Sequence, residues 1–382
     1  MPAAERTPRV PLLAQLLIAT VAGAVAGKLV GPRAAALGDA ALIFVDVLKL
    51  LATPLVFVAI VDTFVTTRLP VKRALVLLPL SALNAIVAAA IAIGLGRVLP
   101  LHRFVDLPRL RALAPPAAAA HHLPSVNLLW VIAAALGTGI VLRALGGTRA
   151  AQAIARATGA AMRALMHLVG LVVRVVPLAV FGVMAKVVSG SGLAMFPLLA
   201  IFVLLVALGM ALQVIFWYAL LLKLVARVSP NRFFRFAADP LLTAIGVGSS
   251  LATLPVTLRA LDEMEVSKES ARLAAVVGTN LNHDGIVLYE AAAALFVAQV
   301  YGITLALGTQ VKVVGLAVLA AVGIAGVPEA GLVTLSLVIG GVGLPLAAVP
   351  LLLPVDWMLG RLRAMTNVAS DLTVANVLDR FR

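Results

Sequence analysis

The sequence contains no cysteine among its 382 residues, and only 12% of its residues are charged. The missing cysteines exclude disulfide bonds, thiolate metal ligands and cysteine nucleophiles, but they say little about the compartment. The low charge separates this chain from soluble domains, which are about one quarter charged and about half apolar. Because 63% of the residues are hydrophobic and the mean hydropathy is +1.12, we exclude a single soluble core and predict a membrane protein.

Acidic residues are scarce as well: 16 Asp and Glu stand against 30 Lys and Arg, for a formal net charge of +14. The basic residues lie between hydrophobic runs rather than on one polar face. This distribution favours loops that follow the positive-inside rule, and no nucleic-acid partner is expected. The cytoplasmic loops are therefore predicted at Arg6 and Arg9, at Arg68 to Arg73, at Arg143 to Arg163 and at Lys223 to Arg235. Both termini are assigned to the cytoplasm.

Six apolar runs are long enough to cross a bilayer, near residues 11–31, 40–65, 72–100, 124–146, 161–189 and 194–226. The first run lacks a small-residue cleavage pattern, so it is expected to remain as a helix. Two later apolar stretches are interrupted instead. LLTAIGVGSSLATLPVTLRAL is broken by Gly246, Gly248, Ser249, Ser250 and Pro255, and VKVVGLAVLAAVGIAGVPEAGLVTLSLVIGGVGLPL by Gly323, Gly326, Pro328 and Gly331.

Each interrupted stretch predicts a helical hairpin that enters the membrane, turns at a Gly/Ser/Pro tip and leaves by the same face. Unwound backbone at membrane depth is tolerated only inside protein or beside a water-filled cavity. A pair of such segments in corresponding places indicates the binding site of a transporter. The alternative is two kinked spans whose glycines serve helix packing.

Polar residues gather in the two spans that follow these stretches, TNLNHDGIVLYE and VPLLLPVDWMLGRLRAMTNVASDLTVANVL. In the second, Asp356, Arg363, Asn367 and Asp371 are separated by seven, four and four residues, which places them near one helical face. Charges inside a membrane are costly and usually face a cavity or a partner. We therefore expect this face to line a functional site.

Four motifs beyond residue 236 resemble, in order, those of the dicarboxylate/amino acid:cation symporter family, which includes the glutamate transporters. GSSLATLPVT resembles the serine-rich first hairpin tip, and NLNHDGIVLYE resembles the Asn-Met-Asp-Gly-Thr span. GIAGVPEAG resembles the second tip, and VDWMLGRLRAMTNVASDL resembles the last helix. A looser likeness in LKLLATPLVFVAIV and VPLAVFGVMAKVV extends the resemblance over nearly the whole chain.

The resemblance implies an all-α polytopic membrane protein with about eight transmembrane helices plus two re-entrant helical hairpins, in a glutamate-transporter-like elevator fold. Residues 1–382 would form a single transporter domain. Its scaffold would lie mainly in 1–230, and its transport core mainly in 236–382 with parts of the third and sixth helices. The family also implies a homotrimer in the lipid bilayer.

Sodium ligands are assigned by the resemblance. Gly278, Asn282 and Asn367 would offer backbone oxygens and Asp371 its carboxylate to one ion. A second ion would be held by Asn280 with the carbonyls of Ala321, Val322 and Ile324, and a third by the side chains of Asn282 and Asp284. The remaining ligands of the third site align with Ala85, Ala88 and Ala89. Fewer coupled sodium ions than in complete family members are therefore expected, with Asp284 paired to another group or protonated.

The residues implied in substrate binding are Ser249, Ser250, Val327, Gly331, Gly360, Arg361, Arg363 and Asn367. Arg363 matches the arginine that holds a substrate carboxylate, a planar group that a guanidinium grips with two parallel hydrogen bonds. The alternative is a structural ion pair with Asp356. Gly360 stands where amino-acid-transporting relatives have an aspartate for the ammonium group, so an amino acid would bring an unpaired cation into the pocket at a cost of several kcal/mol.

Other departures bear on the substrate and on coupling. Ile286 replaces a threonine that helps hold the same carboxylate, so the pocket is more apolar and could prefer a monocarboxylate or another organic anion. Glu329 adds a negative charge that would repel a dianion unless Arg361 neutralises it. Glu290 matches a proton carrier, and a buried carboxyl group makes proton coupling chemically available; a structural hydrogen bond to Arg361 is the alternative. His283 replaces the family's methionine, as a group that titrates near neutral pH or as a neutral ring filling the space.

The leading hypothesis is a secondary active symporter that moves a small organic anion, such as a four-carbon dicarboxylate, or an amino acid, coupled to sodium, protons or both. A diverged member that carries a monocarboxylate, conducts ions only or scaffolds a partner is the alternative. An enzyme using His283 and Asp284 is disfavoured, since no metal-ligand repeat or activated nucleophile is present. No cofactor beyond the coupling ions is expected. Richness in alanine, arginine and leucine points to a bacterial plasma membrane.

Overall fold

The computed structural model describes residues 12–66, 71–99, 128–146, 148–322 and 331–381, and every regular element in these ranges is helical. The N-terminal half contains α1 (Leu12–Val30), α2 (Ala35–Thr66), α3 (Val71–Val98), α5 (Leu128–Ala144), α6 (Arg149–Val173), α7 (Val176–Ser191) and α8 (Met195–Leu212). The helix of α8 continues through π-helical turns at Gln213–Tyr218 and Leu222–Ala226, which flank α9 (Ala219–Leu221). The all-α architecture implied by the resemblance is thus confirmed for the described residues.

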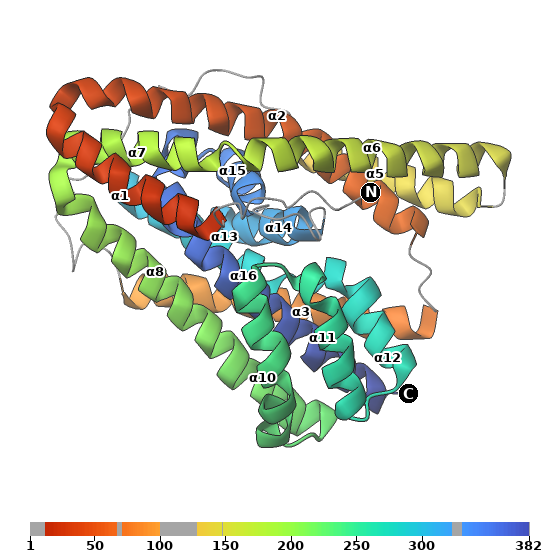
Figure 1. Ribbon diagram of the computed structural model, residues 1–382. Coiled ribbons are helices and arrows are strands. Elements are labelled where there is room, and N and C mark those ends of the chain that lie inside the picture. Colours follow the sequence, from red (N-terminus) through yellow and green to blue (C-terminus); the bar gives the residue numbers. More distant parts are fainter. Residues whose placement is uncertain (1–11, 67–70, 100–127, 147, 323–330, 382) are drawn as a thin grey trace, which may run out of the picture.

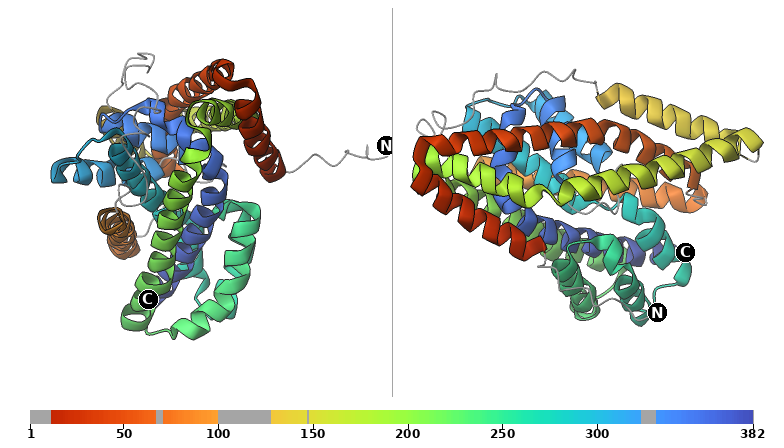
Figure 2. Two further views of the ribbon diagram at one scale, coloured as in Figure 1. Left: turned by 90° about the vertical axis from the view of Figure 1, so that its left-hand side faces the viewer. Right: turned by 45° about the horizontal axis from the view of Figure 1, so that its top comes forward.

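The C-terminal half contains the elements that carry most of the polar residues. These are α10 (Pro230–Val247), α11 (Ser250–Glu263), α12 (Lys268–Arg272), α13 (Asp284–Tyr301), α14 (Leu307–Val322), α15 (Gly331–Gly341) and α16 (Val349–Arg380). Figures 1 and 2 show α1, α2, α6 and α7 on one side of the molecule and α10 to α12 on the other, with α16 running between them.

Glycines let the helices of the first group approach one another closely. A Cβ atom on Gly23 would lie 2.5 Å from the carbonyl oxygen of Phe181, and one on Gly182 would lie 2.3 Å from that of Leu37. Small residues at such crossings are how membrane helices maximise packing, because apolar lipid provides no hydrophobic drive for association. Close contacts of this kind hold α1 and α2 against α7.

One predicted span has different limits from those expected. The run at 161–189 corresponds to α6 and α7, which begin at Arg149 and are bent by 43° relative to each other between Gln152–Val172 and Val176–Gly190. Pro177 lies in the first turn of α7. Because proline has no N–H to donate and blocks the preceding turn, the helix is interrupted just before it.

Both predicted hairpins have their helical arms. In the first, α10 ends at Gly248, whose φ of +72° suits glycine, and α11 begins after Ser249. The helix continues through Gly246 and Pro255, so the chain reverses only at 248–249. In the second, α14 packs against α15, while residues 323–330, including Ile324, Val327 and Glu329, lie outside the described residues.

By length and apolarity, three described helices are able to cross a membrane: Leu75–Val98, Met195–Ala226 and Asp284–Tyr301. The bent pair of α6 and α7 makes a fourth if it counts as one span. The hairpin arms Leu307–Ala321 and Gly331–Gly341 are apolar but shorter. Short arms are what a segment needs if it enters the bilayer and turns back partway.

Candidate functional site

A break in the chain before α13 creates the first part of the site. A π-helical turn at Leu273–Val277 and a short 3-10 helix at Gly278–Asn280 are followed by non-helical residues up to His283, and α13 then begins at Asp284. The sequence motif TNLNHDG therefore occupies an interrupted helix. Such breaks bring backbone carbonyls and helix ends to one place within the membrane.

Asn282 and Asp371 meet at this break and are buried. The side-chain amide of Asn282 donates to one carboxylate oxygen of Asp371 at 2.9 Å, and the hydroxyl of Thr279 donates to the other at 3.3 Å. Ser81 of α3 donates to the amide oxygen of Asn282 at 2.7 Å. The buried carboxylate thus faces an amide nitrogen and a hydroxyl group, and carboxylate and hydroxyl oxygens are ligands that suit a small hard cation.

Gly278 and Asn367, the other expected members of the first cation set, lie nearby, but Asn367 does not offer the expected backbone oxygen. The carbonyl of Gly278 accepts the N–H groups of Leu281 and Asn282 at 2.7 and 2.9 Å. Asn367 contributes its side chain, whose oxygen accepts the N–H of Gly285 at 2.9 Å. Because α16 is continuous through Asn367, its carbonyl is directed along the helix axis rather than freed by an unwound turn.

Asp284 is paired with two hydroxyl groups. Tyr218, in the π-helical turn after α8, donates to its Oδ2 at 2.7 Å, and Ser370 of α16 donates to the same oxygen at 2.6 Å. Its Oδ1 is buried and has no hydrogen-bond partner among the described residues. The expectation that Asp284 pairs with another group agrees with this arrangement.

The alanines of α3 that align with the third cation set lie in the apolar core. Ala85, Ala88 and Ala89 are buried there and offer no side-chain oxygen. The residue of α3 that contacts Asn282 is Ser81, about one turn earlier. The helix α3 thus brings to Asn282 a hydroxyl group that the sequence analysis did not name.

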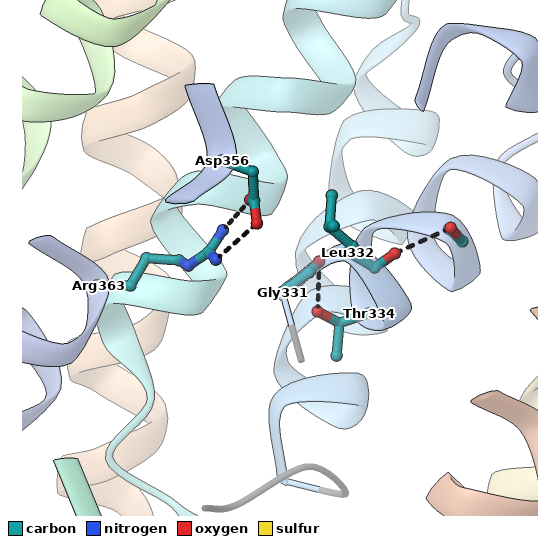
Figure 3. A network of polar contacts seen from close by, with 6 residues as sticks. Gly331, Leu332, Thr334, Asp356 and Arg363 are labelled. Atoms are coloured by element: carbon teal, nitrogen blue, oxygen red, sulfur yellow. Dashed lines mark hydrogen bonds and ion pairs between the residues drawn. The ribbon is translucent and has the colours of Figure 1, made fainter. Parts of the chain in front are cut away.

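Arg363 lies at the second part of the site, beside the first turn of α15, which begins at Gly331 (Figure 3). Its Nη1 and Nη2 atoms donate to the two carboxylate oxygens of Asp356 at 2.6 and 3.2 Å, so the alternative ion pair is formed. Its guanidinium carbon lies 4.3 Å from the centre of the Tyr289 ring. Arg363 and Asp356 are both buried, so this ion pair is enclosed within the protein.

Two glycines let the backbone approach this guanidinium. A Cβ atom on Gly331 would lie 2.4 Å from Cζ of Arg363, and one on Gly360 would lie 3.2 Å from its Nη2. Ile286 is buried on the nearby α13. The surroundings of Arg363 therefore combine one guanidinium, one carboxylate and apolar or backbone surface.

The first hairpin tip is joined to α16 by Arg361. Its Nη1 donates to the carbonyls of Ile245 and Gly246 at 2.8 and 2.6 Å, at the C-terminal end of α10, where carbonyls lack helical partners. Ser249 caps α11 by accepting the N–H of Ala252 at 3.2 Å, and Ser250 is the first residue of that helix. The structure thus brings Ser249, Ser250 and Arg361 to one tip.

Neither carboxyl oxygen of Glu290 has a hydrogen-bond partner among the described residues, so the hydrogen bond considered with Arg361 is not formed. Its side chain is fully buried, and the polar groups close to its carboxyl group are Thr334 of α15 and Arg363. The hydroxyl of Thr334 donates to the carbonyl of Gly331 at 3.0 Å. Glu290 thus belongs with the Arg363 part of the site.

The second cation set is only partly within the described residues. The carbonyl of Ala321 lies 2.9 Å from Nδ1 of His283, and Val322 is the last residue of α14. Asn280 ends the 3-10 helix at the break. Ile324, like Val327 of the substrate set, lies outside the described residues.

Four polar residues of the site escaped the sequence analysis: Ser81, Tyr218, Thr279 and Ser370. Tyr218 is a polar aromatic residue in an otherwise apolar span, and Ser81 is one of few polar residues in α3. Such isolated hydroxyls inside apolar helices are the only signal that could have indicated them, because their partners are remote in the sequence.

Comparisons with known proteins agree with these features. The profile of the sodium:dicarboxylate symporter family matches residues 12–381. Over 257 residues the chain is 36% identical to the mouse protein named Excitatory amino acid transporter 3, covering 67% of this chain and 49% of the relative. It is 35% identical over 264 residues to a Caenorhabditis elegans protein named Excitatory amino acid transporter, covering 68% of this chain and 52% of the relative. The chain therefore spans about half the length of these relatives.

Proposed function

The chain belongs to the sodium:dicarboxylate symporter family, and from this premise we propose that it is a secondary active symporter for a small organic anion. Sodium would be co-transported as a substrate ion. The fold of this family is the glutamate-transporter-like elevator fold, so the proposed transport core of 236–382, with parts of α3 and α8, would carry the anion across the bilayer between the hairpin tips.

The observation that carries this proposal is the position of Arg363. It is buried in a membrane protein, on a continuous helix, and directly beneath the returning arm of the second hairpin. A buried guanidinium is costly unless it has anionic partners. Asp356 provides one, and the outer N–H groups of Arg363 would grip a carboxylate of the transported anion.

The proposed sodium site is the group around Asp371. Its carboxylate provides the negative charge, while Asn282, Thr279 and the carbonyl of Gly278 provide neutral oxygens close by. Sodium requires about six oxygens in place of its water, so a break that gathers backbone and side-chain oxygens supports this role. Glu290, buried beside the Arg363 group, is the proposed site of proton coupling.

We propose a dicarboxylate without an amino group as the preferred anion. Among the side chains described around Arg363, the carboxylates are Asp356 and Glu290, and Asp356 is already in a bidentate pair with Arg363. Gly360, next to Nη2, brings no carboxylate for an ammonium group. An amino acid would leave its ammonium group unpaired in a low-dielectric pocket.

The proposed assembly is a homotrimer in a plasma membrane with both termini in the cytoplasm. Large apolar side chains of α1 are exposed, among them Ile18, Val21 and Leu29. Contiguous exposed apolar surface of this kind requires lipid or another subunit to cover it.

The proposal is tested by binding to the purified protein. Succinate, malate, aspartate and a monocarboxylate are compared by thermal shift, each in sodium and in choline at equal ionic strength. Stabilisation by succinate or malate in sodium, but not in choline and not by aspartate, is the expected result. Stabilisation by aspartate would show that another group holds the ammonium, and a response to the monocarboxylate alone would favour the alternative substrate. No response to any ligand would favour the alternative of a diverged member that conducts ions only or scaffolds a partner.

A further inference from the structure

His283 connects two elements of the proposed transport core. It is the last residue before α13, and its buried side chain reaches the final turn of α14, where Nδ1 lies 2.9 Å from the carbonyl oxygen of Ala321. A carbonyl oxygen can only accept a hydrogen bond, so Nδ1 carries the hydrogen in this contact. The imidazole therefore donates across the gap between the helix break and the second hairpin.

The acceptor lies at the end of α14, where a donating group is favoured. The dipole of a helix makes its C-terminal end negative. Ala321 is the residue before the last one of α14 and is buried. The imidazole N–H of His283 is a donor at this negative end.

The backbone of His283, at the start of α13, is held in place as well. The carbonyl of His283 accepts the N–H groups of Ile286 and Val287 at 3.0 and 3.1 Å, which starts α13. Next to it, the N–H of Gly285 donates to the side chain of Asn367 on α16, and a Cβ atom on Gly285 would lie 2.7 Å from the carbonyl oxygen of Arg363. The backbone of His283 is thus held against α16. The imidazole ring therefore fixes the position of α14 and does not move with it.

We propose that His283 is a built-in substitute for a cation at the end of α14. Its imidazole N–H satisfies the carbonyl of Ala321 and holds the first arm of the second hairpin against the helix break, whether or not sodium is bound. This inference rests on the proposed symport and concerns its coupling. The side chain of His283, rather than a bound sodium ion, fixes the position of α14. Sodium binds instead at the group around Asp371.

Amide hydrogen exchange of the full-length protein tests this inference, in sodium and in choline at equal ionic strength. The variants are His283→Met, which keeps an apolar side chain of similar size, and His283→Asn, whose amide N–H can replace the imidazole donor. In the wild type, exchange over residues 315–322 should differ by less than about twofold between the two salts. In choline, His283→Met should exchange there about tenfold faster, because a buried acceptor is left without a donor.

The expected rescue is equally specific. His283→Asn should stay within about threefold of the wild type, and sodium should slow exchange at 315–322 in His283→Met only. A tenfold slowing by sodium in the wild type would overturn the inference, as would unchanged exchange in His283→Met or failure of His283→Asn to restore protection. If His283→Met does not fold, the wild-type comparison of the two salts still decides.

The same data keep the two proposals apart. Protection by sodium of the peptides around Asn282 and Asp371 tests the proposed sodium site. Its absence would count against symport, while the comparison of His283 variants in choline would still test the histidine contact.

Discussion

Replacing Gly331 with alanine should disable the anion site while leaving the fold and the sodium site in place. A Cβ atom at this position would lie 2.4 Å from Cζ of Arg363 and 2.5 and 2.6 Å from its Nη1 and Nη2 atoms. Ordinary carbon contacts are about 3.5 to 4.0 Å. Either the guanidinium or the arm of the hairpin must therefore move by about 1 Å.

Moving the guanidinium of Arg363 is energetically costly. Its Nη1 lies 2.6 Å from Asp356, so a shift of about 1 Å lengthens this contact beyond hydrogen-bond distance. Breaking a buried ion pair costs about 3 to 5 kcal/mol. If the hairpin arm or the guanidinium moves instead, Arg363 loses its alignment with the anion. Hydrogen bonds to charged groups contribute about 1.5 to 3 kcal/mol each, so we expect a loss of about 3 kcal/mol, which is roughly a hundredfold weaker binding of a dicarboxylate.

A matched control is present in the same helix. A Cβ atom on Gly340 of α15 would meet its nearest neighbour, Leu346, at 3.4 Å, an ordinary contact. Both variants add one methyl group near an end of α15, so a large difference between them reports the contact with Arg363. The assay is calorimetric titration of succinate in saturating sodium, with sodium-dependent thermal stabilisation as the measure of folding.

The reasoning is refuted if Gly331→Ala binds succinate within threefold of Gly340→Ala while both variants are folded. That result would mean that Arg363 does not contact the anion, or that its pocket adapts to an added methyl group without loss.

Three further predictions concern single side chains. Gly360→Asp places a carboxylate on a Cβ that would lie 3.2 Å from Nη2 of Arg363. In succinate-binding assays, the amino acid aspartate should begin to compete, and succinate should bind at least tenfold more weakly. Unchanged selectivity would contradict the role of Gly360. Asp371→Asn removes the charge of the proposed sodium site and should raise the half-saturating sodium concentration at least tenfold in thermal-shift titrations, whereas an unaltered titration would place the ion elsewhere. Ser81→Ala removes the donor to Asn282 and should lower the free energy of unfolding by about 1 to 3 kcal/mol in denaturant melts, with no loss expected only if water replaces the hydroxyl. The ratio of sodium to substrate in flux measurements should be below three.

The sequence predicted best those parts of the site that depend on local spacing. Asp356, Arg363, Asn367 and Asp371 all lie on α16 and face the break before α13 or the Arg363 group, as their helical spacing indicated. The first hairpin turns at Gly248 and Ser249, where a residue suited to positive φ is followed by a helix-capping serine.

The contacts that escaped prediction join residues far apart in the chain. Ser81 is 201 residues from Asn282, and Tyr218 is 66 residues from Asp284. Such pairs depend on how α3 and the π-helical turn pack on α13, and apolar packing in a membrane leaves little trace of register in a run of alanines and leucines. The break at 278–283 was missed for a related reason, since only Gly278 marks it among otherwise ordinary residues.

The unbroken course of α16 has a consequence for how such proteins diversify. Arg363 and Asp371 are eight residues apart on one helix, which fixes them at about 12 Å along its axis. A substitution beside Arg363, for example at Gly360, would alter the proposed anion site without moving the residues around Asp371. If the proposed roles hold, such proteins could change the anion that they carry and keep the same sodium site.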